Sequence, residues 1–305
     1  MAGEGVYTEL RELVLLRHAA RGYSFLPRQP ITSILAGNHA SRLRGRGLDF
    51  EELRAYRPGD DTRSMDWRAT ARLRKPQVRV YQEERDRPAL FLVDQRRGMF
   101  FGSRVAMKSV VAAQAAALGA WRALDQDDRV GGIVFGDGEA SFVRPRRSAA
   151  TVLELLQRVV QHNHALEADG GPDDPGALNR ALERAARTAR HDHLVVLVSD
   201  FHGFDDASER WVTRLAAHND VLAVLVSDPF GRDLPDAGPL SFARGAERVQ
   251  VDTSRREARE RFRARFDELV EGARARLRRL DVPLLQLTPE RPVLEQLHEA
   301  LGSAR

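Results

Sequence analysis

Three aspartates that stand close together in the chain, Asp60, Asp61 and Asp66, could form a cluster of catalytic carboxylates. Arginines alternate with them and supply neighbouring positive charges. This mixture favours ion-paired structure or a recognition surface over catalysis. We therefore predict a partner-binding surface in this stretch, made of Arg57, Asp60, Asp61, Arg63, Asp66, Trp67 and Arg68.

A second pair of carboxylates, Asp94 and Asp200, ends two short apolar runs, ALFLVD and HLVVLVSD. Such runs predict buried strands, and ligands of open α/β sheets bind at the carboxyl ends of the strands. Carboxylate oxygens suit a hard cation such as magnesium. A metal-dependent hydrolase that uses Asp94, Asp200 and the Asp60 cluster is therefore the alternative hypothesis.

Other chemistries find little support. The chain has no cysteine, no G-x-S-x-G sequence and no G-x-x-x-x-G-K-[ST] loop, so no nucleophile or nucleotide site is predicted. Zinc binding is conceivable for the histidines at 162, 164, 191, 193 and 202. We interpret them instead as surface or helix-end residues, with the helix dipole favouring imidazolium at His162 and His164. No cofactor is expected.

The elements that would position Asp94 and Asp200 alternate between strands and helices. The predicted strands are 89–94, 130–135, 193–200, 221–227 and 282–287, with residues 141–143 as a candidate partner of the second. The predicted helices are 104–124, 149–162, 175–190, 207–218, 254–280 (with a capping box from Ser254 and Glu257) and 292–301. Apolar strands of this kind belong to a doubly wound, mostly parallel sheet covered by helices on both faces.

The first 88 residues differ from this pattern. A helix is predicted at 8–20 and a loop at 23–39, followed by a small β-rich element. In that element, 48–56 reads as a strand or a short helix, Pro58-Gly59-Asp60-Asp61 as a turn, and 77–82 as a strand. Trp67 is interpreted as a core residue. We expect a division into 1–36 (helix and linker), 37–88 (β-rich element) and 89–305 (α/β domain).

Composition limits the partners. The net charge is only +4, with 44 acidic residues against 48 basic ones, so generic nucleic-acid binding is not implied. Nucleic-acid binding through the arginine-rich segment 255–279 is a third and weaker hypothesis. Its acidic residues Asp267, Glu268 and Glu271, together with an apolar stripe, favour a packed helix with a solvated polar side. The longest run of low charge, 110–121, is shorter than the ~20 apolar residues that span a bilayer. With no signal-peptide pattern at the start, we expect a cytoplasmic protein without a membrane span.

One motif is specific enough to suggest a family. The pattern G-x-G-x-x-F-x-x-x-R-x-Y-x-P-G-D-D-x-R-x-x-D-W-x-x-x-A-R runs from Gly45 to Arg72 and is followed by V-R-V-Y-x-x-E. With so many residue types at fixed spacing, this pattern resembles the hallmark of the family called domain of unknown function 58. The resemblance implies a von Willebrand factor A-like fold for the later part of the chain.

That fold often builds a metal-ion-dependent adhesion site from Asp-x-Ser-x-Ser, a threonine and a later aspartate. Here the first motif reads Asp94-Gln95-Arg96-Arg97-Gly98, so both serines are missing. The loop expected to supply the threonine, 173–177, contains none. We hypothesise that the site is degenerate, with Asp94 and Asp200 as remnants and Arg96 or Arg97 replacing the metal in an internal salt bridge.

The resemblance also implies partners. Members of this family are commonly associated with MoxR-type AAA+ ATPases, and other von Willebrand factor A-domain proteins are further candidates. The sequence therefore favours a non-catalytic adaptor or scaffold that works with such an ATPase in complex assembly or maturation.

Overall fold

The computed structural model describes residues 5–20, 48–56, 65–83, 87–168, 173–244 and 247–301. The chain divides into two compact units, one made of Met1–Asn38 with Arg87–Arg305 and the other of His39–Asp86. The predicted loop at 23–39 and the predicted turn at 58–61 lie outside the described residues.

The larger unit is built on a six-stranded sheet. Its strands, in spatial order, are β10 (Leu284–Leu287), β7 (Asp220–Val226), β6 (Leu194–Ser199), β3 (Ala89–Asp94), β4 (Val130–Phe135) and β5 (Ser141–Arg146). All neighbouring pairs are parallel except β4 and β5, which are antiparallel. This doubly wound, mostly parallel sheet of the von Willebrand factor A-like type confirms the predicted fold class.

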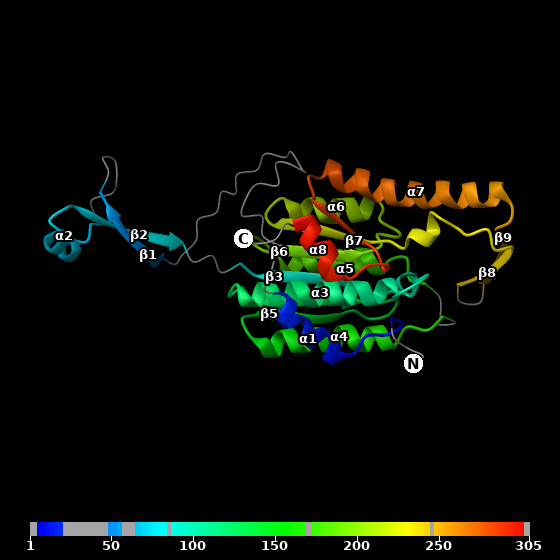
Figure 1. Cartoon of the computed structure of the whole chain (residues 1–305), viewed down its shortest axis with the longest axis horizontal. Helices are drawn as coiled ribbons and strands as arrows, with labels where there is room; N and C mark the ends of the chain where they lie inside the picture. Colours follow the sequence, from blue (N-terminus) through cyan, green and yellow to red (C-terminus); the bar gives the residue numbers. More distant parts are fainter. Residues whose placement is uncertain are drawn as a thin grey trace. The chain divides into compact units, whose positions relative to one another are not determined.

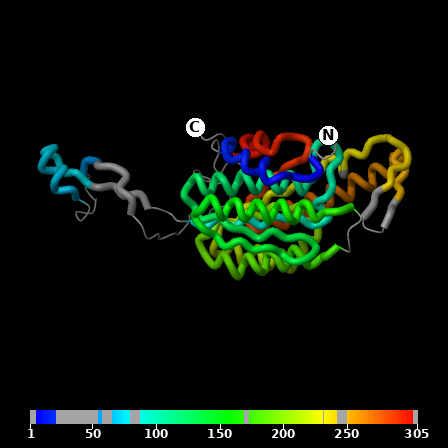
Figure 2. Tube along the Cα trace, turned by 90° about the horizontal axis from the view of Figure 1, so that it is seen from below, coloured from blue at the N-terminus to red at the C-terminus, as the bar shows by residue number. Residues whose placement is uncertain are grey.

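Helices cover both faces of this sheet because its central strands are apolar on both sides. One face carries α1 (Leu10–Ala19), α3 (Lys108–Asp125), α4 (Ala149–His164) and α8 (Val293–Leu301). The other carries α5 (Ala177–Thr188), α6 (Asp206–Ala216) and α7 (Arg256–Arg279). Figure 1 labels these helices, and Figure 2, turned by 90°, shows α1 (blue) and α8 (red) together on the same side.

Side chains of β3 illustrate the two cores. Phe91 and Val93 belong to the core under α3, whereas Leu90 and Leu92 belong to the core under α5 and α6. All four are essentially inaccessible to solvent. The run of apolar residues that predicts this strand is therefore explained by burial on both faces.

Three details differ from the sequence predictions. The helix predicted from residue 104 begins at Lys108. The capping box at the start of α7 is wrong, because the N-cap is Arg255 without a side-chain bond, and the Ser254 hydroxyl donates to Asp252 instead. A hairpin of β8 (Pro239–Arg244) and β9 (Glu247–Asp252) was not predicted.

The smaller unit pairs β1 (Leu48–Ala55) with β2 (Gln77–Glu83) in an antiparallel ladder and adds the short helix α2 (Trp67–Leu73). Ala69 of α2 and Val78 of β2 are buried. The β-rich character predicted for this stretch is therefore observed, and the segment before the turn is a strand rather than a helix.

Candidate functional site

The two strand-end carboxylates come together because β3 and β6 are parallel neighbours. Asp94 is the last residue of β3, and Asp200 follows the last residue of β6. Parallel strands end at the same edge of a sheet, which is where α/β folds bind ligands. The Asp94 side chain is fully buried and that of Asp200 is 12% exposed.

Arg96 occupies the space between the two carboxylates. Its Nη2 lies 2.7 Å from Asp94 Oδ2, and its Nε donates to Asp94 Oδ1 at 3.0 Å. The same Nη2 lies 3.7 Å from Asp200 Oδ1, and Nη1 donates to the His202 carbonyl at 3.1 Å. The salt bridge that the sequence predicts for Arg96 or Arg97 is thus formed by Arg96.

Arg97 points to a different acidic group. Its backbone N–H donates to Asp137 at 2.7 Å, and its guanidinium lies 3.6 Å from Asp173. Asp137 also accepts the backbone N–H of Asp174 at 3.0 Å. The loop 173–177, which contains no threonine, therefore contributes a backbone donor to Asp137 and a carboxylate to Arg97.

A lysine that the sequence analysis did not single out completes the site. Lys108, the first residue of α3, places Nζ 2.7 Å from Asp200 Oδ2. The sequence does offer one reason to notice Lys108, because it is one of only two lysines among 48 basic residues. Its partner is 92 residues away, so the contact itself could not be read from local spacing.

Hydroxyl and backbone donors add a hydrogen bond to each of the two carboxylates. Ser199 donates its hydroxyl to Asp94 Oδ2 at 2.6 Å, and the His202 N–H donates to Asp200 Oδ1 at 2.9 Å. Between them, Phe201 adopts a left-handed backbone with φ 54°, which is uncommon for a bulky residue. Its N–H donates to the Ser199 hydroxyl at 2.9 Å. The turn after β6 is thus held to the end of β3 by hydrogen bonds.

The electrostatics follow from this packing. Burial alone would raise the pKa of Asp200, but Lys108, Arg96 and the His202 N–H outweigh it and hold that pKa well below its usual range. Burial would lower the pKa of Arg96, but the carboxylates of Asp94 and Asp200 outweigh it and raise that pKa. Both groups therefore stay charged, and two cations balance two carboxylates inside the protein.

These residues do not fit a divalent-cation site. Both oxygens of Asp94 are bound by the Arg96 guanidinium, and both oxygens of Asp200 already accept hydrogen bonds. A divalent cation at this position would stand against two positive side chains. Within the described ranges, no three histidines, aspartates or glutamates are grouped so that they could hold a metal ion.

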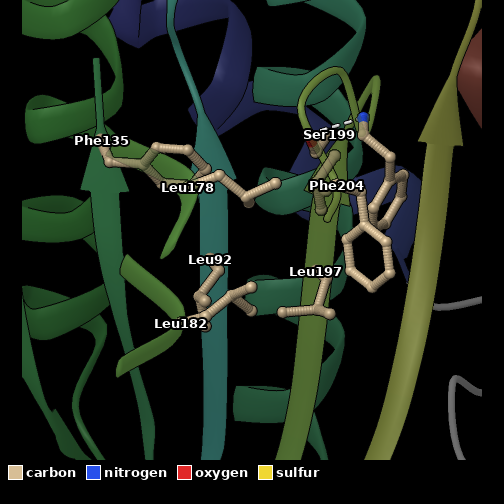
Figure 3. Close-up of a pocket in the computed structure, with 9 residues that line it drawn as sticks. Leu92, Phe135, Leu178, Leu182, Leu197, Ser199 and Phe204 are labelled. Carbon is tan, nitrogen blue, oxygen red and sulfur yellow. Dashed lines mark hydrogen bonds between the residues drawn. The ribbon is translucent and has the colours of Figure 1, made fainter. Parts of the chain in front are cut away.

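The cavity below the site is too small for a substrate. It has a volume of about 10 Å³ and lies among apolar side chains of β3, β6, α5 and the loop after β6, as Figure 3 shows for Leu92, Leu178, Leu182, Leu197 and Phe204. A single water needs at least about this volume. We interpret the cavity as a packing gap.

A larger groove of about 450 Å³ lies along α7. There Arg232 pairs with Asp267, and Arg274 pairs with Glu271 and donates a hydrogen bond to Gln286.

Four of the predicted partner-binding residues, Arg57, Asp60, Asp61 and Arg63, lie outside the described residues. The other three belong to α2. Asp66 is its N-cap and accepts the N–H groups of Arg68 and Ala69, both at 2.9 Å. Trp67 is 69% exposed, so its interpretation as a core residue is wrong, because Ala69 is the residue of this helix that faces inward. Arg68 is exposed.

The histidines differ from prediction in one respect. His162 is held against the Ser141 hydroxyl at 3.0 Å. Burial, with Arg158 as a second cause, lowers the pKa of His162. The neutral ring is therefore favoured there, and the expectation that the helix dipole favours imidazolium at His162 is wrong.

Comparison with known proteins identifies the family of this chain. The chain matches the family described as "Protein of unknown function DUF58" over residues 52–271. An uncharacterized protein of Mycobacterium tuberculosis is 30% identical over 295 residues, which cover 95% of this chain and 90% of that protein. The chain therefore belongs to the DUF58 family, as its motif predicts.

Solved structures with some similarity include BatB, a conserved hypothetical protein from Bacteroides thetaiotaomicron, with a TM-score of 0.44 and 13% identity over 70% of this chain and 94% of that one. The SpRpn10 VWA domain gives a TM-score of 0.37 and 13% identity over the same shares of the two chains. The fold assignment rests on the order and directions of the strands in this chain. None of the helices that the structure describes has the length and apolar character needed to cross a bilayer.

Proposed function

We propose that this protein is a non-catalytic interaction module that serves as an adaptor for a MoxR-type AAA+ ATPase in complex assembly or maturation. The observation that carries the proposal is the strand-end site, where Arg96 and Lys108 bind the two carboxylates that would otherwise hold a metal or activate a water. A site neutralised in this way supports a structural role for the α/β unit.

The metal-dependent hydrolase is less well supported by the same residues. A carboxylate acting as a base or as a metal ligand needs an accessible oxygen. Both Asp94 oxygens are bound by Arg96, and each Asp200 oxygen already accepts a hydrogen bond beside the positive charge of Lys108 or Arg96. No observation among the described residues favours that alternative. The ATPase as partner and a cytoplasmic location remain parts of the proposal, and they rest on the family resemblance and on the sequence.

A binding experiment tests the proposal. The full-length protein is mixed with the purified MoxR-type ATPase of its own source organism, with ATP, with ADP and without nucleotide. Binding is measured by biolayer interferometry. The proposal expects binding that depends on the nucleotide. It also expects loss of binding in Asp61→Ala or Trp67→Ala protein with an unchanged melting temperature. Absence of binding in all nucleotide states would refute the ATPase proposal.

A further inference from the structure

The helix α2 presents a surface whose composition suggests the chemistry of its partner. Its inward side is identified by one buried residue and by two hydrogen bonds to β2, and its start by an N-cap. Ala69 is 4% exposed, the Thr70 hydroxyl accepts the Gln77 N–H at 2.9 Å, the Asp66 N–H donates to the Gln77 carbonyl at 2.9 Å, and Asp66 caps the helix. At 3.6 residues per turn, Trp67 then lies on the side opposite Ala69.

The outward surface of α2 combines this indole with positive charge. Four cations stand on the helix or directly after it, and all are exposed: Arg68, Arg72, Arg74 and Lys75. None of the four forms an ion pair with a described residue. Residues 67–75 contain no acidic side chain, and Asp66 before them is engaged at the helix N-terminus.

The larger unit offers a contrast in its long helix α7. Several exposed arginines of α7 are paired, for example Arg256 with Glu260 at 2.7 Å and Arg265 with Glu268 at 2.7 Å. Arg276 reaches Asp206 on another helix at 2.8 Å. The four α2 cations form no ion pair with a described carboxylate, so we take them as candidates for pairing with carboxylates of another molecule.

We infer that the α2 surface, defined as Trp67, Arg68, Arg72, Arg74 and Lys75, docks into an acidic groove of a protein partner. Tryptophan and arginine are the residues most enriched among binding hot spots, and a positive patch selects a negative one. The inference rests on the proposed function and adds that the ATPase surface meeting this protein is acidic and offers a slot for an indole.

A membrane is a weaker match for this surface. Interfacial helices insert one continuous apolar face. In α2 the exposed apolar side chains, Trp67 and Leu73, are six residues apart and about 120° apart around the helix axis. A protein groove that receives one indole and several cations fits this arrangement better.

Three variants test the inference in the full-length chain. Trp67→Ala removes the indole, and the double change Arg68→Glu with Arg72→Glu reverses the charge. Arg74→Gly removes one cation at a position with φ 52°, where glycine is relaxed, so this variant should fold normally. The control is Arg261→Glu with Arg278→Glu, which makes the same charge change at exposed positions of α7.

Affinity for the purified MoxR-type ATPase is measured at low and at physiological salt. We expect roughly tenfold weaker binding or more for the first two variants, a smaller loss for Arg74→Gly, and a change below about threefold for the α7 control. Salt should weaken the wild type and have less effect on the charge-reversed protein.

The outcomes separate the two proposals. Wild-type binding that survives all three α2 variants would overturn this inference and the expected loss in Trp67→Ala protein. It would leave ATPase binding itself, and so the adaptor proposal, standing. A wild type that does not bind would overturn both. Sedimentation with phosphatidylcholine vesicles, with and without phosphatidylglycerol, is run in parallel. Association that needs the anionic lipid and is lost in the α2 variants would assign the surface to membranes and overturn the inference as well.

Discussion

Replacing Arg96 by methionine should strongly destabilise the α/β unit. The change removes a buried positive charge, since the Arg96 side chain is 8% exposed and that of Asp94 is fully buried. Asp94 would keep the Ser199 hydroxyl at 2.6 Å and the backbone N–H of residue 96 at 2.9 Å, but no cation in contact. Removing one partner of a buried ion pair costs about 3–5 kcal/mol.

The assay is denaturant unfolding at neutral pH, followed by circular dichroism. The loss in free energy of unfolding corresponds to a melting temperature lower by roughly 6–20 °C for a unit of this size. The matched control is Arg104→Met, because the Arg104 side chain is 75% exposed and pairs with Glu290 at 3.2 Å. Exposed pairs of this kind contribute about 0–1 kcal/mol.

A second variant shows whether charge is the cause. Asp94→Asn combined with Arg96→Met removes both charges, and replacing a whole buried pair is often nearly neutral. The double variant should therefore recover most of the stability lost by Arg96→Met. An Arg96→Met protein as stable as the Arg104→Met control would refute the ion-pair reasoning.

Two further predictions concern stability. The pKa of His162 is lowered from 6.5 by burial and by Arg158, so the folded state binds fewer protons than the unfolded state below that pH. Stability should consequently fall as the pH drops below about 6.5, and urea titrations of His162→Gln protein should show a shallower fall. A Cβ at Gly132 would lie 2.7 Å from the Phe91 carbonyl oxygen. Gly132→Ala should therefore lower the free energy of unfolding by about 1–3 kcal/mol. Gly138→Ala is its control, because nothing lies within 4 Å; equal losses in the two variants would contradict the packing argument.

The sequence predicts the sheet well because burial on both faces leaves a clear record. The runs that form β3, β6 and β7 are apolar except for one residue at an end of each, which is typical of strands buried on both faces. The hairpin of β8 and β9 leaves no such record, since it pairs only with itself. The start of α7 was predicted wrongly because the serine used for the capping box bonds Asp252 instead.

The candidate site was predictable only in part. Asp94 and Arg96 are two residues apart, so sequence and charge sign were enough to expect their pairing. Lys108 joins Asp200 through the packing of α3 on the sheet, which local spacing does not encode. The position of Trp67 differs from its prediction for a related reason. Its size suggests a core, but the small Ala69 lets α2 approach the hairpin and leaves the indole outside.

The most direct test of the central claim, that Arg96 and Lys108 close the strand-end site with the protein's own cations, is the effect of divalent metal on the melting temperature. The wild-type protein is heated with and without millimolar magnesium or manganese, alongside Asp94→Ala protein. The account predicts the same wild-type melting temperature in all three solutions. A rise with metal that disappears in Asp94→Ala protein would contradict it and revive the metal-dependent hydrolase.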